Sequence, residues 1–414
     1  MKHLHLLLLA AFCLPLFFSC QTVGEVPDPE EGLPAFPKPA EQINRIPLTR
    51  SEEGFVQAGN EFAWRLTRKL WDQSKGSMIL SPLSVQYALG MLGNGADEAV
   101  AAKLAAVLGY EGTEAINAYC AKMIECLPMV DTTITLALAN GVIFDESFTL
   151  KLPFKTAVTE SYDALVESMP FTLPELVKKR VNDWCEKHTY GRIKDVLDSV
   201  DPLAFMYLMN AIYFNAKWTD SFDANYTKTE DFKALSGRSK KVKMMHKTFD
   251  IMPYAESESC QTISLSYGRG AYSIQLYLPK QSSDLAVLME NPSKGLKYET
   301  CKVILSLPCF ETEFKTDLLG LLVSMGLPTG SYNELIEENR LNEISKVIHK
   351  ANITVNEKGT EAAAVTVIEM KVSAAGPGVS EPRTVYFTAD HPFLYTITEN
   401  STGAILFTGV YTGD

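Results

Sequence analysis

The sequence predicts an α+β fold, in which helices and strands are segregated along the chain. Helical spacing of apolar residues dominates the first half, whereas short apolar or alternating runs typical of sheet strands dominate the second. Repeated βαβ units would instead alternate the two patterns. Hydrophobic residues make up 46% of the 414 residues and charged residues 21%, which is enough for a sizeable core.

Four helices are expected in the first half of the chain. Residues 51–73 place Phe55, Phe62, Leu66 and Leu70 at helical spacing, with Ser51 as the expected N-cap. Residues 78–84 form a short strand that turns into a second helix, because Ser-Pro-x-Ser suits a helix start. Further amphipathic helices are expected over residues 97–108 and 180–197.

Strands are expected mainly in the second half. Residues 208–214 form an apolar run that leads to Lys217 and Trp218. Three later runs alternate or are continuously apolar, as sheet strands are: residues 303–310, 348–355 and 405–410.

The first 49 residues are expected to lie outside the folded domain. Residues 1–19 combine a basic start with a short apolar core, which is typical of a secretory signal. Cys20 after Ser19 resembles a bacterial lipoprotein acceptor, and its acyl chains would hold the protein on a membrane, as an outer-membrane lipoprotein facing the periplasm or the cell surface. The alternative is an ordinary secreted protein cut nearby. Residues 20–49 are rich in proline and acids and form a tether.

The net charge bears on the possible partners, and the cysteine spacing bears on possible disulfides. Thirty-eight basic against 50 acidic residues give a net charge of −12, which argues against nucleic acid. Six of the eight cysteines lie beyond the signal and Cys20, none at CxxC spacing, and we expect buried thiols. The sequence leaves a Cys120–Cys126 disulfide open.

No enzyme motif is found. The chain lacks GxSxG, HExxH, a P-loop and GxGxxG, although a serine or cysteine triad could still assemble in space. Asp390-His391-Pro392 looks like a metal motif only in isolation. We therefore expect no catalytic residue, no metal and no cofactor.

The segment 355–383 has two contrasting halves. Residues 359–368 contain no proline and alternate so that one face carries only small or apolar uncharged residues, which permits a strand buried on one side. Residues 373–382 contain Gly376, Pro377, Gly378 and Pro382 and are typical of exposed irregular chain. Sequence capable of forming a strand thus continues directly into an exposed loop.

This combination resembles the hinge and reactive loop of the serpins, inhibitors that trap serine and cysteine proteases. The hinge match covers residues 357–364, and the motifs at 387–394 and 403–409 follow in the family's order. The resemblance spans residues 50–414. It implies a single domain, where length alone suggests two, with several helices, three β-sheets, a metastable central sheet and a reactive loop at about residues 357–386.

The resemblance also implies roles for individual residues. His349 is expected either as a satisfied core histidine or as a partner of Asn210 under the opening sheet. Where many serpins carry a lysine after Leu-Pro, this chain has Cys309, so Glu357 would lack that partner. The implied hinge residues are Glu357, Gly359, Thr360, Glu361, Ala362, Ala363 and Ala364, and the implied residues of the shutter and breach, where the sheet parts, are Ser81, Ser84, Asn210, Trp218 and His349.

The hinge fixes the expected scissile bond. Counting as in inhibitory serpins from Gly359 reaches Ser373-Ala374, with Met370, Lys371 and Val372 as neighbouring candidates. Serine or valine suits elastase-like and subtilisin-like proteases, and Lys371 suits trypsin-like ones. Counting back from Asp390 instead reaches Glu381, and Arg383 lies too far along to be productive.

Three functions remain open. The first is an irreversible suicide-substrate inhibitor that acts as a monomer on proteases. The second is a non-inhibitory serpin that serves as a binding protein or chaperone, and the third is a hydrolase with an unrecognised site. The chain shows no basic stripe of the kind that binds heparin, since segment 111–130 has only Lys122 as a basic residue.

Overall fold

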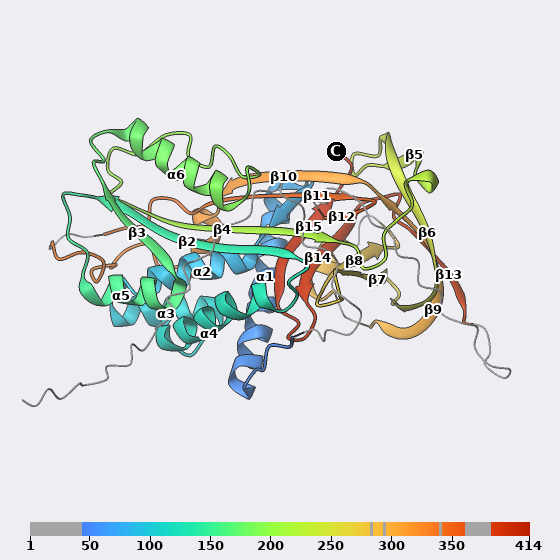
Figure 1. Ribbon diagram of the computed structural model, residues 1–414, viewed down its shortest axis with the longest axis horizontal. Coiled ribbons are helices and arrows are strands. Elements are labelled where there is room, and N and C mark those ends of the chain that lie inside the picture. The colour runs from blue at the N-terminus through green and yellow to red at the C-terminus, as the bar shows by residue number, and fades with distance from the viewer. Residues whose placement is uncertain (1–43, 282–284, 293–294, 339–341, 361–381) are drawn as a thin grey trace, which may run out of the picture.

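The fold consists of two β-sheets with helices packed around them (Figure 1). The computed structural model describes residues 44–281, 285–292, 295–338, 342–360 and 382–414. Within them lie eight α-helices and fifteen strands, and the helices cluster in the first half of the chain. The expected α+β class is therefore confirmed.

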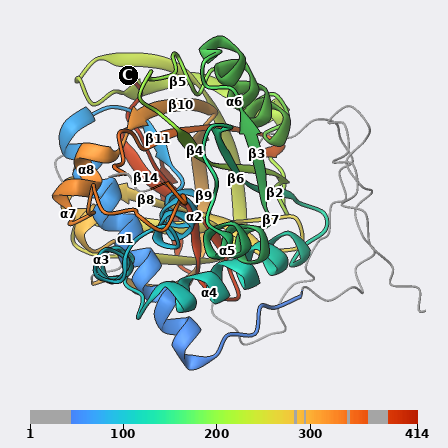
Figure 2. The same cartoon turned by 90° about the vertical axis from the view of Figure 1, so that its left-hand side faces the viewer.

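Helices lie on both faces of the six-stranded sheet. Figure 2 shows α6 alone above the sheet, with α2, α4 and α5 below it. The described helices are α1 (Arg50–Ser74), α2 (Pro82–Gly93), α3 (Glu98–Leu108), α4 (Thr113–Cys126), α5 (Leu152–Tyr162), α6 (Pro174–His188), α7 (Leu285–Glu290) and α8 (Leu319–Ser324), with 3-10 turns at Leu127–Met129 and Ala224–Tyr226.

Two helices start where the sequence predicts, and two start elsewhere. α1 is capped by Thr49 and not by Ser51, because Thr49 and Glu52 form a reciprocal capping box. Ser81 and Asp97 cap α2 and α3 as their sequences suggest. α6 begins at Pro174, six residues before the expected start, because proline suits the first turn of a helix.

The six-stranded sheet holds the region of interest. Adjacent strands within this sheet run antiparallel, except for one parallel pair at its edge. In spatial order it contains β10 (Phe310–Asp317), β11 (Ile348–Asn356), β12 (Gly359–Thr360), β4 (Met206–Lys217), β2 (Thr135–Asp145) and β3 (Ala164–Met169).

The second sheet has nine strands and two parts. The 18-residue strand β6 pairs with β9 along most of its length and with β7 only at its end, so it joins the two parts. Two of the three expected β-sheets are thereby connected, and the described strands form two hydrogen-bonded sheets. The order is β1 (Met78–Leu80), β15 (Ile405–Tyr411), β14 (Phe393–Glu399), β8 (Tyr272–Pro279), β7 (Cys260–Tyr267), β6 (Ser239–Glu256), β9 (Lys297–Pro308) and β13 (Thr384–Thr388), with β5 (Lys228–Lys233) on β6.

Two hydrophobic clusters hold these layers together. The larger one joins α1 and α2 to both sheets, with Phe62, Leu66 and Tyr87 fully buried. The smaller one lies under α6, where Trp184 packs with Ile143 of β2 and Met209 of β4. The six-stranded sheet is thus buried on both faces over part of its area.

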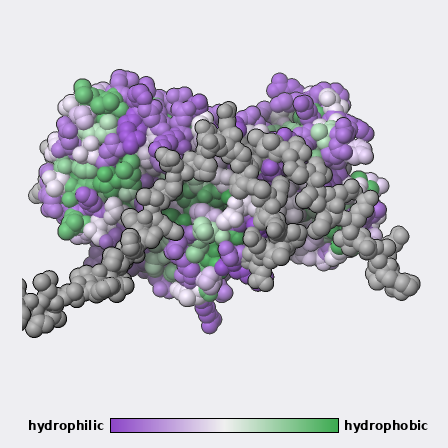
Figure 3. Space-filling view, viewed as in Figure 1, coloured by the Kyte–Doolittle hydropathy of each residue, from purple (hydrophilic) through white to green (hydrophobic). Residues whose placement is uncertain are grey.

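The surface is mixed in polarity. Apolar side chains gather at the end of the molecule where α5 and the start of α6 lie (Figure 3), and Leu152, Leu173 and Leu176 are among the exposed ones. Across the residues that the structure describes, no helix has the length and apolarity needed to cross a membrane.

Candidate functional site

Strand β12 separates two central strands at one end only. Gly359 pairs with Lys217 of β4 and Asn356 of β11, and Thr360 pairs with Ala216 and Val355. β4 and β11 therefore run in the same direction, and β12 is antiparallel to both. A longer β12 would be a central strand with antiparallel ladders on both sides.

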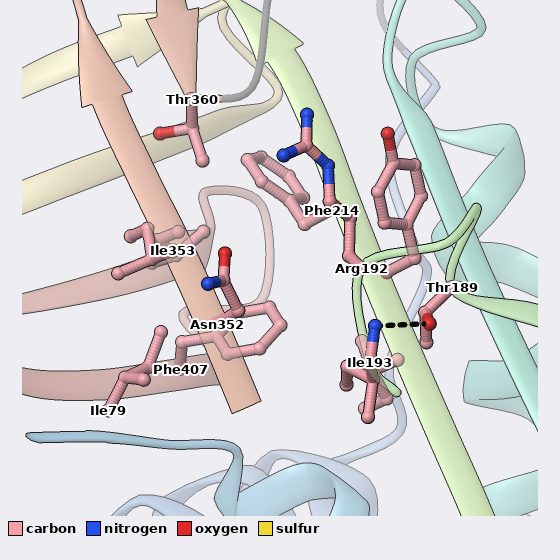
Figure 4. A pocket seen from close by; sticks show the side chains of 12 residues that line it. Ile79, Thr189, Arg192, Ile193, Phe214, Asn352, Ile353, Thr360 and Phe407 are labelled. Carbon is pink, nitrogen blue, oxygen red and sulfur yellow. Dashed lines mark hydrogen bonds between the residues drawn. The ribbon is translucent and has the colours of Figure 1, made fainter. Parts of the chain in front are cut away.

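Beyond Thr360 the two strands enclose a gap, which we call the slot. Its walls include Ile212 and Phe214 of β4 and Asn352 and Ile353 of β11, and Thr360 closes its upper end (Figure 4). The slot holds about 360 Å³, including space open to solvent. Among the described residues no strand pairing fills it. Side chains from the nine-stranded sheet lie beneath it: Ile79, Ile397 and Phe407.

Gly359 is required where β12 begins. Its φ is +148°, which L side chains rarely adopt, and a Cβ there would lie 2.1 Å from the carbonyl oxygen of Ala216. The close approach lets β12 start directly against the backbone of β4.

Thr360 is the first side chain to enter the slot. It is 2% exposed, and its hydroxyl lies 2.5 Å from that of Tyr267 in β7. Tyr267 also stacks on Trp218, with ring centroids 4.5 Å apart. The predicted hinge is thus held by the nine-stranded sheet as well as by its own strands.

Hydrogen bonds to its backbone carbonyls fix the turn before β12. Trp218 donates from Nε1 to the Asn356 carbonyl at 2.8 Å and from its amide to the Lys358 carbonyl at 2.9 Å. The Phe222 amide donates to the Glu357 carbonyl at 2.9 Å. The predicted breach residue Trp218 therefore lies directly on the hinge turn.

Glu357 has a partner despite the missing lysine. Thr227 Oγ1 donates to its carboxylate at 2.9 Å. Burial and the nearby Glu357 carboxylate raise the pKa of the Cys309 thiol to about 12, so this thiol stays protonated at neutral pH. Cys309 thus stands where many serpins carry the lysine, and Glu357 instead accepts its hydrogen bond from Thr227, which follows the 3-10 turn at Ala224–Tyr226.

A segment after α6 crosses the outer side of the slot. Thr189, Arg192 and Ile193 line the slot, and the Thr189 hydroxyl accepts from the Ile193 amide (Figure 4). Lys315 of β10 donates to the Asp195 carbonyl at 2.9 Å and the Asp198 carboxylate at 2.8 Å. A strand entering the slot would pass beneath this segment.

The residues expected under the opening sheet do lie together. Ser81 Oγ donates to the Leu406 carbonyl at 2.9 Å, and Ser84 Oγ donates to the side-chain oxygen of Asn210. The ring of His349 accepts from the Ser81 amide at 3.3 Å, so the expected pair with Asn210 is replaced. The reason is that His349 and Asn210 belong to β11 and β4, on opposite sides of the slot.

The polar cluster also includes Asn140, and its histidine is uncharged. Asn140 of β2 accepts from Asn210 Nδ2 at 2.7 Å, and no sequence motif indicated this residue. Burial lowers the pKa of His349 to about 4, so its ring is neutral near pH 7.

The far end of the predicted loop is anchored in the other sheet. Strand β13 pairs in parallel with β9 from Thr384 to Thr388. The remaining predicted site residues lie outside the described residues: Cys20, Glu361, Ala362, Ala363, Ala364, Met370, Lys371, Val372, Ser373 and Ala374.

One row of side chains has the order of a hydrolase triad. Ser306 Oγ lies 3.0 Å from His246 Nδ1, and His246 Nε2 lies 2.9 Å from Glu230 Oε1. The three residues stand on β9, β6 and β5, and Ser306 is 9% exposed. The row therefore ties three strands together and presents a poorly accessible hydroxyl.

His391 and the six described cysteines are the remaining candidates for a metal site or a disulfide. His391 bonds to the Asp390 carboxylate and the Pro279 carbonyl, each at 2.7 Å. Within the described part of the chain no group of three histidine, cysteine or acidic residues could hold a metal ion. The six described cysteines form no disulfide, and Cys120 and Cys126 are separate thiols.

Comparison with known proteins gives a consistent picture. A family model described as Serpin (serine protease inhibitor) matches residues 57–413. The chain is 33% identical over 377 residues to Serpin-Z1C of Triticum aestivum, which covers 84% of this chain and 93% of the relative. It is 32% identical over 380 residues to Serpin B8 of Homo sapiens, covering 86% and 98%.

Solved structures are similar over the same length. Arabidopsis AtSerpin1 in its native stressed conformation superimposes with a TM-score of 0.76 at 26% identity. The superposition covers 88% of this chain and 99% of that one.

Proposed function

The chain belongs to the serpin family of serine protease inhibitors, and from this membership we propose that it is an irreversible suicide-substrate inhibitor of serine endopeptidases, with cysteine endopeptidases as a second target class. The observation that carries the proposal is the slot. β12 already occupies its upper end, and the chain that follows Thr360 is the predicted reactive loop.

The first step is ordinary proteolysis. The active-site oxygen or sulfur of the protease attacks the carbonyl carbon of residue 373, an acyl-enzyme ester or thioester forms, and the amine of residue 374 leaves. Cutting releases the arm after Thr360 from its far anchor in β13. The arm can then extend β12 down the slot.

Insertion supplies the driving force for trapping. About fourteen residues at strand rise carry the attached protease roughly 45 Å, and the new strand gains ladder bonds on both sides. If this movement outruns hydrolysis of the ester, the protease is distorted and the acyl bond persists. The intact protein is then kinetically trapped, and the cut releases its stored free energy.

The composition of the arm suits this path. Thr360, Ala362 and Ala364 share one face at period two, and Thr360 is already buried in the slot. Small uncharged side chains can pass between β4 and β11, whereas a charge there would lose its hydration. This supports rapid insertion.

We assign the scissile bond to Ser373-Ala374, with cuts after Met370, Lys371 and Val372 as neighbours. Elastase-like or subtilisin-like proteases are the proposed targets, and trypsin-like proteases are the second choice because of Lys371. The inhibitor acts as a monomer on the cell envelope. Cys20 carries the lipid after residues 1–19 are removed, and residues 20–49 form the tether.

A second candidate function is a non-inhibitory binding protein. A cleft of about 560 Å³, including space open to solvent, lies beside Trp218. Its walls include Phe222, Phe249, Met252 and Leu265, which would suit an apolar small molecule. This function predicts that proteases cut the loop without being trapped.

One experiment separates the candidates. The protein is incubated with elastase-like, subtilisin-like and trypsin-like proteases, followed by denaturing electrophoresis and mass spectrometry of the released peptide. An inhibitor gives a denaturant-stable band at the summed mass and a peptide beginning at residue 374. Complete turnover with no such band for any protease contradicts the proposal. Hydrolysis of ester substrates that survives loop deletion would instead favour the Ser306 row.

A further inference from the structure

Arg383 is held by side chains of two strands. It lies directly before β13, and its Nη2 atom is 3.1 Å from Glu256 Oε1 of β6 and also contacts Glu299 Oε1 of β9. Its guanidinium carbon is 5.6 Å from the ring centroid of Tyr254. We call Arg383, Glu256, Glu299 and Tyr254 the clamp.

The clamp is built around an ionised carboxylate. The Tyr254 hydroxyl donates to Glu256 Oε2 at 2.9 Å, and Lys280 Nζ lies 3.9 Å from the same oxygen. The hydrogen bond from Tyr254, followed by that from Arg383, holds the pKa of Glu256 below its usual value. The hydrogen bond to Glu299 raises the pKa of Arg383. The Glu256 carboxylate and the Arg383 guanidinium are therefore both charged at neutral pH.

The main chain of Arg383 is also engaged. The Lys302 amide donates to the Arg383 carbonyl at 2.9 Å, and the ladder with β9 begins at the next residue. A protease that cuts after arginine needs a free arginine side chain and a substrate backbone that it can pair itself. Both are occupied at the bond between Arg383 and Thr384.

The position of β13 adds a second consequence. β13 is an edge strand that pairs only with β9 among the described strands, along five residues. In an uncut chain, residues 361–383 join β12 in one sheet to β13 in the other. The uncut arm can enter the slot fully only if β13 leaves β9 and follows it.

We propose that Arg383 is a positioning residue, which fixes the far stem of the reactive loop through the clamp. The proposal rests on the proposed inhibitor function. Anchored in this way, the stem resists cutting at Arg383-Thr384 by trypsin-like proteases, a cut that would spend the loop unproductively. The same anchor slows insertion of the uncut loop, so the protein stays competent until a protease arrives.

The test keeps Arg383 and removes its partners. The double variant Glu256→Gln/Glu299→Gln is compared with Asp250→Asn, which removes the 3.1 Å pair of Asp250 with Lys302 on the same two strands without touching Arg383. Near-ultraviolet circular dichroism establishes that each variant is folded. A charge exchange in the Glu256→Gln background, Arg383→Glu with Glu299→Arg, provides the rescue, because it restores one ion pair without setting a second carboxylate against Glu256.

Two readouts decide the proposal. Without protease at 37 °C, the double variant should lose inhibitory capacity about fivefold faster than the wild type, since two exposed ion pairs are lost. With a trypsin-like protease, it should yield a fragment beginning at Thr384 that the wild type does not yield. Asp250→Asn should match the wild type in both assays, and the charge exchange should restore most of the lifetime.

Failure of the clamp proposal can be distinguished from failure of the proposed inhibitor function. A double variant that matches Asp250→Asn in either readout overturns the proposal, and so does a charge exchange that restores nothing. A wild type that traps no protease refutes the proposed function instead. In that case the Thr384 fragment still decides whether the clamp protects the bond.

Discussion

The hydroxyl groups of Tyr267 and Thr360 lie 2.5 Å apart, and their hydrogen bond joins β7 of one sheet to the first residues of the predicted reactive loop in the other. Thr360 is 2% exposed, so the path that the cut loop is proposed to follow is already occupied at its first position. The size and charge of the side chain at position 360 should therefore decide whether the cut loop can insert into the slot.

A charge at Thr360 should turn the inhibitor into a substrate. Thr360→Arg would require burial of a guanidinium between β4 and β11, at a cost of several kcal/mol. We expect cleavage at an unchanged rate and loss of the denaturant-stable complex. The control is Thr360→Ser, which keeps the hydroxyl and should keep the complex. A complex of normal yield with Thr360→Arg would show that this side chain does not enter the slot.

Replacing Gly359 should loosen the start of β12. In Gly359→Ala the new Cβ meets the Ala216 carbonyl at 2.1 Å, and we expect a loss of about 3 kcal/mol in the free energy of unfolding. Gly191 also has a positive φ, +80°, but open space around its Cβ position. Gly191→Ala should therefore cost only about 1 kcal/mol. Urea unfolding of both variants measures this, and equal losses would argue against the contact with Ala216.

His349 should make stability depend on pH. Its folded pKa of about 4 lies below the usual 6.5, because burial disfavours the imidazolium. Between these values the unfolded chain binds more protons, so the free energy of unfolding falls by a few kcal/mol as the pH drops from about 6.5 to 4. His349→Gln should flatten this part of the profile. Urea titrations at pH 7.5 and 5 test it, and an unchanged difference in the variant would exclude His349 as the source.

Loosening the segment over the slot should speed insertion. Lys315→Ala removes contacts with Asp195 and Asp198, and the stability of the intact protein should change little because the Asp198 carboxylate is largely exposed to solvent. We expect fewer protease turnovers per trapped complex. Lys241→Ala removes a similar pair with Asp231 on the other sheet and is the control. A Lys315 variant with more turnovers than this control would mean that the segment does not obstruct the slot.

Local patterns in the sequence predicted the elements but not how they meet. The alternation of residues 348–355 matches the alternating burial of β11, and Ser81 caps α2 as its motif suggests. The expected start of α6 at residue 180 is too late, because Pro174 opens the helix and Val177 already belongs to its buried face. These features are local, so nearby residues decide them.

Contacts across the sheets lay beyond such patterns. Asn140, Tyr267 and Thr227 reach the site from strands or turns far away in the sequence, and none belongs to a motif. His349 is the satisfied core histidine that the sequence allowed, since it accepts from the Ser81 amide, while Asn210 bonds to Ser84 and Asn140 instead. The sequence presents Arg383 only as a cutting site, because its partners Glu256 and Glu299 meet it only where β6 and β9 lie side by side.

The most direct test of the account is the thermal stability of the protein before and after a single cut in the reactive loop. A fourteen-residue central strand should raise the unfolding midpoint by about 20 °C or more, at roughly 1 kcal/mol per ladder bond gained. Calorimetry of the intact and nicked chains, both purified without bound protease, measures this difference. A nicked protein that melts at or below the temperature of the intact one would contradict the account.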